Sequence, residues 1–239
     1  MPVPNAARLL EIWESAPGDS PVEVGLMLLA AAGEDASSLT IGEFDARLLE
    51  LRRSLFGRAM NASASCPDCS SRLDVELDAA RLRPPGGAPP AESLEIEQDG
   101  YRVSFRMPRI PDARAAAAAG SAGAARLVLL RRCVTAARRD GAGVPAEDLP
   151  EAVCRAIGER MDCEDPEAGF VLGVTCPCCG HSWEAPLDAA AYLAREINAW
   201  AVRVLSEVHT LASRYGWAER DILALSPKRR RLYLEMGSG

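Results

Sequence analysis

Two Cys-Pro-x-Cys motifs carry the side chains best suited to chemistry in this 239-residue chain. The first motif supplies Cys66 and Cys69, and the second supplies Cys176 and Cys179. Each motif is a tight turn with two thiolates, which is half of the four soft ligands that a tetrahedral zinc ion prefers. The two motifs together predict a structural Zn²⁺ site made of these four cysteines.

The two motifs belong to one repeated element. CPDCSSRLDVELDAARL from Cys66 aligns without gaps with CPCCGHSWEAPLDAAAY from Cys176, sharing the outer cysteines, the proline and the closing Leu-Asp-Ala-Ala. Each copy is predicted to be a strand, a turn and a second strand. The repeat favours zinc over a redox dithiol or a site that has lost its metal. Cys178 could replace a neighbouring ligand, but it aligns with Asp68, so the repeat favours Cys179. His181 could be an alternative ligand, but a histidine of the turn beside the site is the favoured interpretation.

The other cysteines and the histidines suggest no active site. Cys133, Cys154 and Cys163 are expected to be small core residues. Only two histidines are present, His181 and His209, and the motifs of phosphate-binding, dinucleotide-binding and serine-hydrolase sites are absent. Zinc with four thiolates has no open position for water. The sequence therefore predicts a protein that is not an enzyme and has no small-molecule substrate.

Charge and hydropathy limit the partners. Lys and Arg number 27 against 34 Asp and Glu, a net charge of −7, which argues against coating of nucleic acid or an anionic membrane. No apolar run reaches the roughly 18 residues that span a bilayer, and the start lacks a basic-then-apolar leader. We therefore expect a cytoplasmic protein with no membrane partner, where clustered cysteines indicate a metal rather than disulfides.

Helices are predicted on the N-terminal side of the first motif. Asn5 is expected to cap a helix that stops at Pro17-Gly18, and an apolar helix follows over residues 22–32. Thr40 and Glu43 form a capping box that starts a third helix, which ends at Gly57. Residues 1–83 are thus expected to form N-terminal helices and the first zinc knuckle.

An inserted subdomain is predicted over residues 84–165. Its first segment, residues 84–90, is a Pro/Gly-rich linker, and Asp99-Gly100 indicates a β-hairpin. Helices are expected from Asp112 onward, over residues 124–138 and over residues 150–161, with a loop at 139–143 between the last two. A buried strand, residues 170–174, then leads into the second motif.

A long helix is predicted from Asp188 to Gly216, because apolar residues recur at spacings of three and four. A last helical segment, residues 219–235, is interrupted at Ser226-Pro227. Residues 166–239 thus hold the second knuckle and the C-terminal helices. The expected fold class is α+β, mainly helical: a bipartite zinc-ribbon-like element of two Cys-Pro-x-Cys β-hairpins, joined to a long C-terminal helix, with an inserted hairpin-plus-helices subdomain.

The basic run Lys228, Arg229, Arg230 and Arg231 has three interpretations. It could bind phosphate, as zinc ribbons in nucleic-acid-binding proteins suggest, or it could be a solvated helix end. Leucines and Tyr233 interleave with the charges, and the whole chain is acidic, so contact with a protein is favoured. Trp200, Trp217 and Tyr215 are expected to pack in the core.

The C-terminal residues resemble a known family. HTLASRYGWAERDILALSPKRRRLYLE, with the preceding helix and FDARLLELRRSLFG, is similar to the baseplate hub assembly chaperones of T-even-type phages. The version most similar is found in gene clusters of phage-tail-like contractile injection systems. The resemblance covers the flanks and both knuckles but not residues 84–165, and the phage members generally lack the knuckles.

The resemblance implies a non-enzymatic assembly factor or minor component of a baseplate or hub. Its partners would be baseplate, hub or spike proteins of a contractile injection system. Its most specific residues make these candidates for partner binding: Tyr215, Trp217, Lys228, Arg229, Arg230, Arg231 and Tyr233. The alternative function is that of a zinc-ribbon nucleic-acid-binding regulator that uses residues 228–231.

Overall fold

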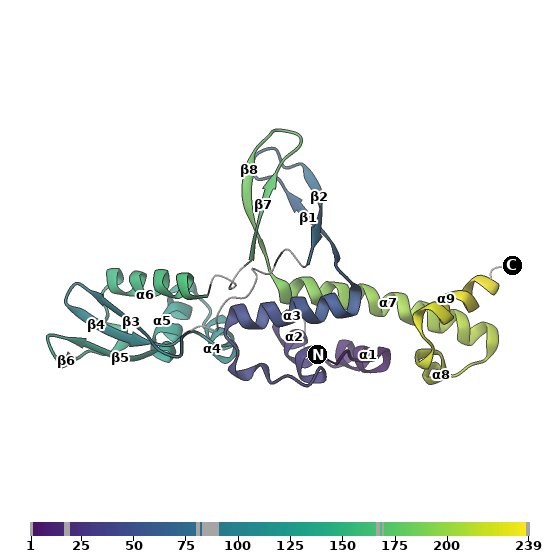
Figure 1. The fold of residues 1–239 in the computed structure, drawn as a ribbon, viewed down its shortest axis with the longest axis horizontal. Coiled ribbons are helices and arrows are strands. Elements are labelled where there is room, and N and C mark those ends of the chain that lie inside the picture. Colours follow the sequence, from purple (N-terminus) through teal and green to yellow (C-terminus); the bar gives the residue numbers. More distant parts are fainter. Residues whose placement is uncertain are drawn as a thin grey trace. The chain divides into compact units, whose positions relative to one another are not determined.

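The fold is mixed α+β and mainly helical (Figure 1). The computed structural model describes residues 2–16, 20–79, 82, 91–165, 168 and 170–237. The chain divides into two compact units, one formed by residues 1–34 with 189–239 and the other by residues 35–188. No helix in the described ranges combines the length and apolar character needed to cross a bilayer.

The first unit is helical. Its elements are α1 (Ala6–Ser15), α2 (Pro21–Ala31), α7 (Ala189–Tyr215), α8 (Glu219–Ala224) and α9 (Pro227–Met236). The Asn5 side chain accepts from Arg8 N–H and caps α1, as predicted. The predicted long helix is confirmed as α7, and the break at Ser226-Pro227 is confirmed between α8 and α9. The Pro17-Gly18 stop lies outside the described residues.

The core of this unit forms where α1, α8 and α9 pack along α7. Its fully buried members include Ala201, Leu211 and Ile222. On α7, the buried members Ala201, Val204, Val208 and Leu211 lie three, four and three residues apart, so one stripe of this helix faces the core. Trp200 is partly buried against this core, as expected of a packing residue.

The second unit begins with a helix that leads into the first cysteine hairpin. It contains η1 (Ala36–Ser38), then α3 (Ile41–Phe56), which Thr40 and Glu43 start with the predicted capping box. Gly57 ends α3 with a φ of 87°, a conformation that glycine adopts at low cost. Strands β1 (Ala59–Ser65) and β2 (Arg72–Asp78) then form an antiparallel hairpin.

A four-stranded antiparallel sheet and three helices follow. The sheet order is β3 (Leu94–Gln98), β4 (Tyr101–Phe105), β5 (Val134–Arg139) and β6 (Ala142–Gly143). The helices are α4 (Ile110–Ala117), α5 (Ala122–Cys133) and α6 (Glu151–Glu164), with the short η2 (Ala146–Asp148) before α6. Asp99 and Gly100 have φ values of 52° and 79°, so the predicted hairpin turn is confirmed. The predicted linker 84–90 lies outside the described part of the chain.

One predicted helix is wrong over its last third. Residues 124–138 were expected to be helical throughout, but the helix ends at Cys133 and β5 begins at Val134. β5 pairs with β4, and Ala137 lies opposite Val103 in the core of this region. Pairing with β4 therefore overrides the helical preference of Ala136 and Ala137. It supplies hydrogen-bond partners for the backbone groups along the edge of β4, which would otherwise be unpaired. The predicted loop 139–143 is confirmed only at the turn Asp140-Gly141, because Arg139 ends β5 and Ala142–Gly143 forms β6.

An aspartate holds the helices of this region in place. Asp112, 1% exposed at the start of α4, accepts from the Arg106 guanidinium at 2.6 Å and from Arg132 Nε at 2.6 Å. The backbone N–H of Arg109 donates to the same carboxylate. Burial alone would raise the pKa of Asp112, but these hydrogen bonds and charges lower it to about 2. The ionised carboxylate thus joins α4, the end of α5 and the segment after β4.

Candidate metal centre

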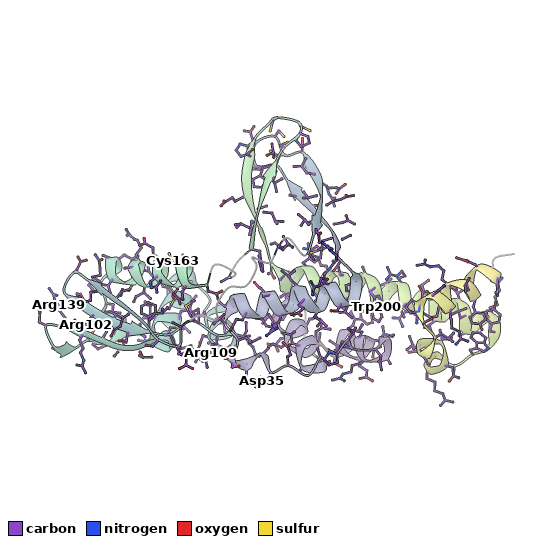
Figure 2. All side chains as sticks on the ribbon, in the orientation of Figure 1. Asp35, Arg102, Arg109, Arg139, Cys163 and Trp200 are labelled. Carbon is purple, nitrogen blue, oxygen red and sulfur yellow. The ribbon has the colours of Figure 1, made fainter. Side chains whose placement is uncertain are left out.

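Two β-hairpins bring the four predicted ligands together. The hairpin β1–β2 carries Cys66 and Cys69 in its turn, and β7 (Phe170–Thr175) and β8 (Ser182–Leu187) form the hairpin that carries Cys176 and Cys179. The two hairpins lie side by side, and sulfur atoms gather at their turns (Figure 2). The four Sγ atoms all lie within 4.8 Å of one another.

The two turns have the same backbone hydrogen bonds, as the sequence repeat requires. Cys66 N–H donates to Ser71 O at 2.9 Å, and Cys176 N–H donates to His181 O at 2.8 Å. In the reverse direction, Ser70 and Gly180 donate to the carbonyls of the first cysteine of each motif. Ser70 has a φ of 60° and Gly180 a φ of 76°. The turn thus requires a left-handed residue, which the second copy meets with glycine and the first meets with serine at a steric cost.

Helix α3 positions the first hairpin through a buried arginine. Arg52 is 3% exposed and donates to Gly57 O at 2.8 Å and Ala59 O at 2.7 Å. These bonds satisfy a carbonyl at the end of α3 and one at the start of β1. At the base of this hairpin, the Arg58 guanidinium contacts the Asp78 carboxylate across the two strands. The hairpin is therefore fixed at its base, and its cysteine turn lies at the opposite end.

The distances between sulfur atoms fit a tetrahedral metal site. Cys66 Sγ lies 3.6 Å from Cys179 Sγ, and Cys69 Sγ lies 3.6 Å from Cys176 Sγ. Four sulfurs at about 2.3 Å from zinc would be separated by about 3.8 Å, whereas a disulfide bond is about 2.05 Å long. Both short contacts join one hairpin to the other. The four cysteines could therefore bind one metal ion that links the hairpins.

A small apolar cluster lies beneath the sulfurs. Cys66 and Cys176 are buried, and they pack with Leu73 and Val174 between the hairpins. The partly buried residues packed against this cluster are Val75, Leu172, Trp183 and Ala185. Two-stranded hairpins of this size are marginally stable by themselves. A metal bound by both turns would add the stability that so few apolar contacts cannot supply.

Hydrogen bonds prepare two of the thiols to ionise. The Ser71 hydroxyl, 3.3 Å from Cys69 Sγ, and its backbone N–H together lower the pKa of Cys69 to about 6. The backbone N–H groups of Cys179 and Cys178 lower the pKa of Cys176. Such N–H donors favour the thiolate that metal binding needs.

The four thiols do not all ionise in the absence of a cation. The His181 N–H lowers the pKa of Cys179, but burial and the three neighbouring cysteines outweigh it and raise that pKa to about 12. A divalent cation at the centre of the four sulfurs would remove this opposition, since it stabilises every thiolate at once.

The remaining cysteines and His181 lie outside this group. Cys178 is exposed, and His181 is exposed with its ring stacked 6.0 Å from the Trp183 ring. Cys133 and Cys154 are buried, as predicted, but the prediction for Cys163 is wrong because this side chain on α6 is exposed (Figure 2). It follows the last buried residues of α6 and faces away from the stripe that contains Val153 and Ile157.

The aromatic candidates for partner binding form a cluster in the first unit. The Tyr215 and Trp217 rings stack with centroids 4.8 Å apart, and Tyr233 meets Trp217 edge-on at 4.9 Å. Tyr215 OH also donates to the carbonyl of Tyr233 at 3.1 Å. All three are partly buried, so they hold α9 against the end of α7.

The basic run divides into one buried and three exposed residues. Arg230 is 3% exposed and donates to Glu207 Oε2 at 2.9 Å and Leu225 O at 2.8 Å. Lys228, Arg229 and Arg231 are exposed.

The sequence analysis did not identify Ser71, whose hydroxyl and N–H lie beside the Cys69 thiol. The available signal was its position two residues after the second cysteine, where the other copy of the repeat has His181. Met236, which is 71% exposed on α9, was also missed.

A comparison with family models matches residues 27–191 to the family described as T4 bacteriophage base plate protein. The match covers well over half of the chain, and it includes both cysteine motifs and the segment between them. Residues 192–239 lie outside it. No curated protein and no solved structure matches the chain.

Proposed function

Because the chain belongs to the family of T4 bacteriophage base plate proteins, we propose that it is a non-enzymatic assembly factor or minor component of the baseplate or hub of a phage-tail-like contractile injection system. The match over residues 27–191 is the observation that carries this proposal. It supports a baseplate-related structural role. The likeness of residues 209–235 to hub assembly chaperones supports the narrower assignment, and it lies in a part of the chain that the match does not cover.

The proposal assigns zinc to the four-cysteine site and gives the metal a structural task. The spacing of the sulfurs, the N–H donors around them and the all-thiolate ligand set support zinc. The metal would close a zinc-ribbon-like pair of hairpins across the 106 residues between Cys69 and Cys176. Four thiolates complete the coordination of zinc, which supports a role without catalysis.

The segment between the two hairpins is proposed to be an inserted subdomain, residues 84–165, between an N-terminal part (1–83) and a C-terminal part (166–239). Its separate hydrophobic core supports this division, since that core draws on β3, β4, β5 and α6 and on no residue of the cysteine hairpins. The proposal places the protein in the cytoplasm, where thiols remain reduced and available to a metal.

The partners in this proposal are baseplate, hub or spike proteins, bound through the C-terminal helices. A pull-down with the tagged full chain from cells that express the neighbouring genes tests it. Recovery of a baseplate, hub or spike protein is expected, and deletion of the gene should give tails with missing or incomplete baseplates in electron micrographs. Normal particles after deletion, with no such protein recovered, would contradict the proposal.

A further inference from the structure

Helix α9 exposes a face that is both cationic and apolar. We call Lys228, Arg229, Arg231, Leu232 and Met236 the α9 face. Leu232 is 45% exposed and Met236 is 71% exposed, and their spacing of four places them on the same side of the helix. Lys228 precedes Leu232 by four residues and Arg229 precedes it by three, so cations lie next to the apolar pair.

The opposite side of α9 is fixed to the rest of its unit. Arg230 donates to Glu207 on α7, and Tyr233 packs edge-on against Trp217. The Ser226 hydroxyl caps the helix by accepting from Arg229 N–H. The α9 face is therefore the exposed side of a helix whose opposite side is packed.

The three cations of the α9 face have no ion pair with any described residue of the chain. Glu235 is the one acidic residue on α9, and its place four residues after Arg231 and three after Leu232 puts it on the same side, so the charge of this side is +2. The charge of the chain is also unevenly distributed. Residues 189–239 hold 8 Lys and Arg against 5 Asp and Glu, a net of +3, although the compact unit that they form with residues 1–34 holds 9 against 10, a net of −1. The unpaired positive charge favours an acidic partner.

We infer that the α9 face binds an acidic amphipathic helix of a partner protein. This inference rests on the proposed function for the identity of the partner, and it adds the chemistry of the contact. The partner would place apolar side chains, spaced three and four residues apart, on Leu232 and Met236. Carboxylates beside them would pair with Lys228, Arg229 and Arg231.

The apolar pair distinguishes a protein from other anionic partners. Phosphates of a nucleic acid would pair with the three cations but would leave Leu232 and Met236 in water. Two apolar side chains bury too little surface to hold a protein on a membrane. A helix that carries both apolar side chains and carboxylates would cover Leu232 and Met236 and would pair with the three cations of the α9 face.

The small size of the face predicts a weak contact. Residues 228–236 cover about 12 Å of helix at 1.5 Å per residue, or roughly two turns. Interfaces of this size are typical of transient complexes, and exposed ion pairs are screened by salt. The contact is therefore expected to have a micromolar Kd and to weaken as salt is raised, which suits a factor that leaves after assembly.

The test measures binding of labelled peptides to the full chain by fluorescence anisotropy. One probe is a helical peptide of about 18 residues with Leu at i, i+3, i+4 and i+7, flanked by Glu. A scrambled peptide of the same composition, a short DNA duplex and vesicles of phosphatidylglycerol and phosphatidylcholine are the other probes. The variants are K228E/R229E/R231E, L232S/M236S and, as a matched control, R195E/R203E/R220E in the same unit.

The amphipathic peptide should bind at least tenfold more tightly than the scrambled one. Both α9 variants should weaken it tenfold or more, and the control variant should change it less than twofold. Circular dichroism would verify that each variant stays folded. Equal binding of the two peptides, equal loss in the control variant, or tighter α9-dependent binding of DNA or vesicles would overturn the inference.

The inference and the proposed function can fail separately. Peptide binding with normal baseplates in the gene deletion would leave the α9 face intact and refute the proposed function. Defective baseplates in the deletion, together with normal baseplates in the K228E/R229E/R231E strain, would refute the inference about α9 alone.

Discussion

Cys69 Sγ and Cys176 Sγ lie 3.6 Å apart although 107 positions separate the two residues in the chain. Cys66 and Cys179 repeat this relationship at the same distance. Bringing together two points so far apart in the chain has an entropic cost, which grows slowly with loop length. A metal bound by both hairpins would offset that cost, so the stability of residues 35–188 should depend on it.

Cys176→Ser is expected to lower the free energy of unfolding by about 3 kcal/mol or more, because it removes one of four ligands and with it the metal. A chelator should destabilise the wild type to a similar extent and leave the variant almost unchanged. Denaturant titration followed by circular dichroism measures both effects. Cys178→Ser is the matched control in the same turn. A loss in the control equal to that of Cys176→Ser would refute the ligand assignment.

The left-handed positions of the two turns predict opposite effects. Gly180→Ala should destabilise the chain by about 1 kcal/mol, because a Cβ is disfavoured at positive φ although nothing lies within 4 Å of it. Ser70→Gly should stabilise it by a similar amount. Gly173→Ala on β7, where φ is ordinary and the space is open, is the control and should have little effect. Thermal unfolding measures all three, and a common sign for Ser70→Gly and Gly180→Ala would contradict the account.

Asp112→Asn should destabilise the chain by about 2 to 4 kcal/mol, because it leaves two arginines without the buried carboxylate. The pKa of Asp112 is lowered from 3.8 to about 2 on folding. The stabilisation from its charge is therefore present above about pH 4 and lost as the pH falls toward 2. The variant should lose this part of the acid dependence. Asp140→Asn, an exposed turn residue, serves as the control, and an equal effect there would exclude the specific role of Asp112.

Asp45 on α3 predicts a pH dependence of the opposite sign. Burial raises the pKa of this carboxyl from 3.8 to about 7, with contributions from the charges of Asp188 and Asp165. The folded state thus prefers the protonated acid, so this residue opposes folding increasingly as the pH rises from 4 to 7. Asp45→Asn should stabilise the chain by about 1 to 3 kcal/mol at pH 8 and by little at pH 4. Unfolding at both pH values tests this, with exposed Asp74→Asn as the control; equal gains at both would contradict it.

Much of the fold follows from local signals in the sequence. The cap of Asn5, the capping box of Thr40 and Glu43, the Asp99-Gly100 turn and the apolar spacing of α7 each specify an element through contacts within a few residues. The repeat of the two cysteine motifs predicted which sulfurs lie together, because equal turns present equal ligands.

The wrong predictions concern features that depend on contacts between residues far apart in the sequence. Val134–Arg139 is a strand because β4 lies beside it, a contact across about 30 residues that no local pattern reveals. The exposure of Cys163 depends on which side of α6 meets the sheet. The pairing of Arg230 with Glu207 separates one arginine from a run of four similar residues, and the sequence alone treats all four alike.

The most direct test of the account is metal analysis of the purified full chain, combined with X-ray absorption at the zinc edge. We predict about one zinc per chain with four sulfur neighbours at about 2.3 Å. Cys176→Ser should lose the metal, and Cys178→Ser should retain it. A folded chain without metal, or zinc coordinated by nitrogen or oxygen in place of the four sulfurs, would contradict the claim that Cys66, Cys69, Cys176 and Cys179 hold a structural zinc ion.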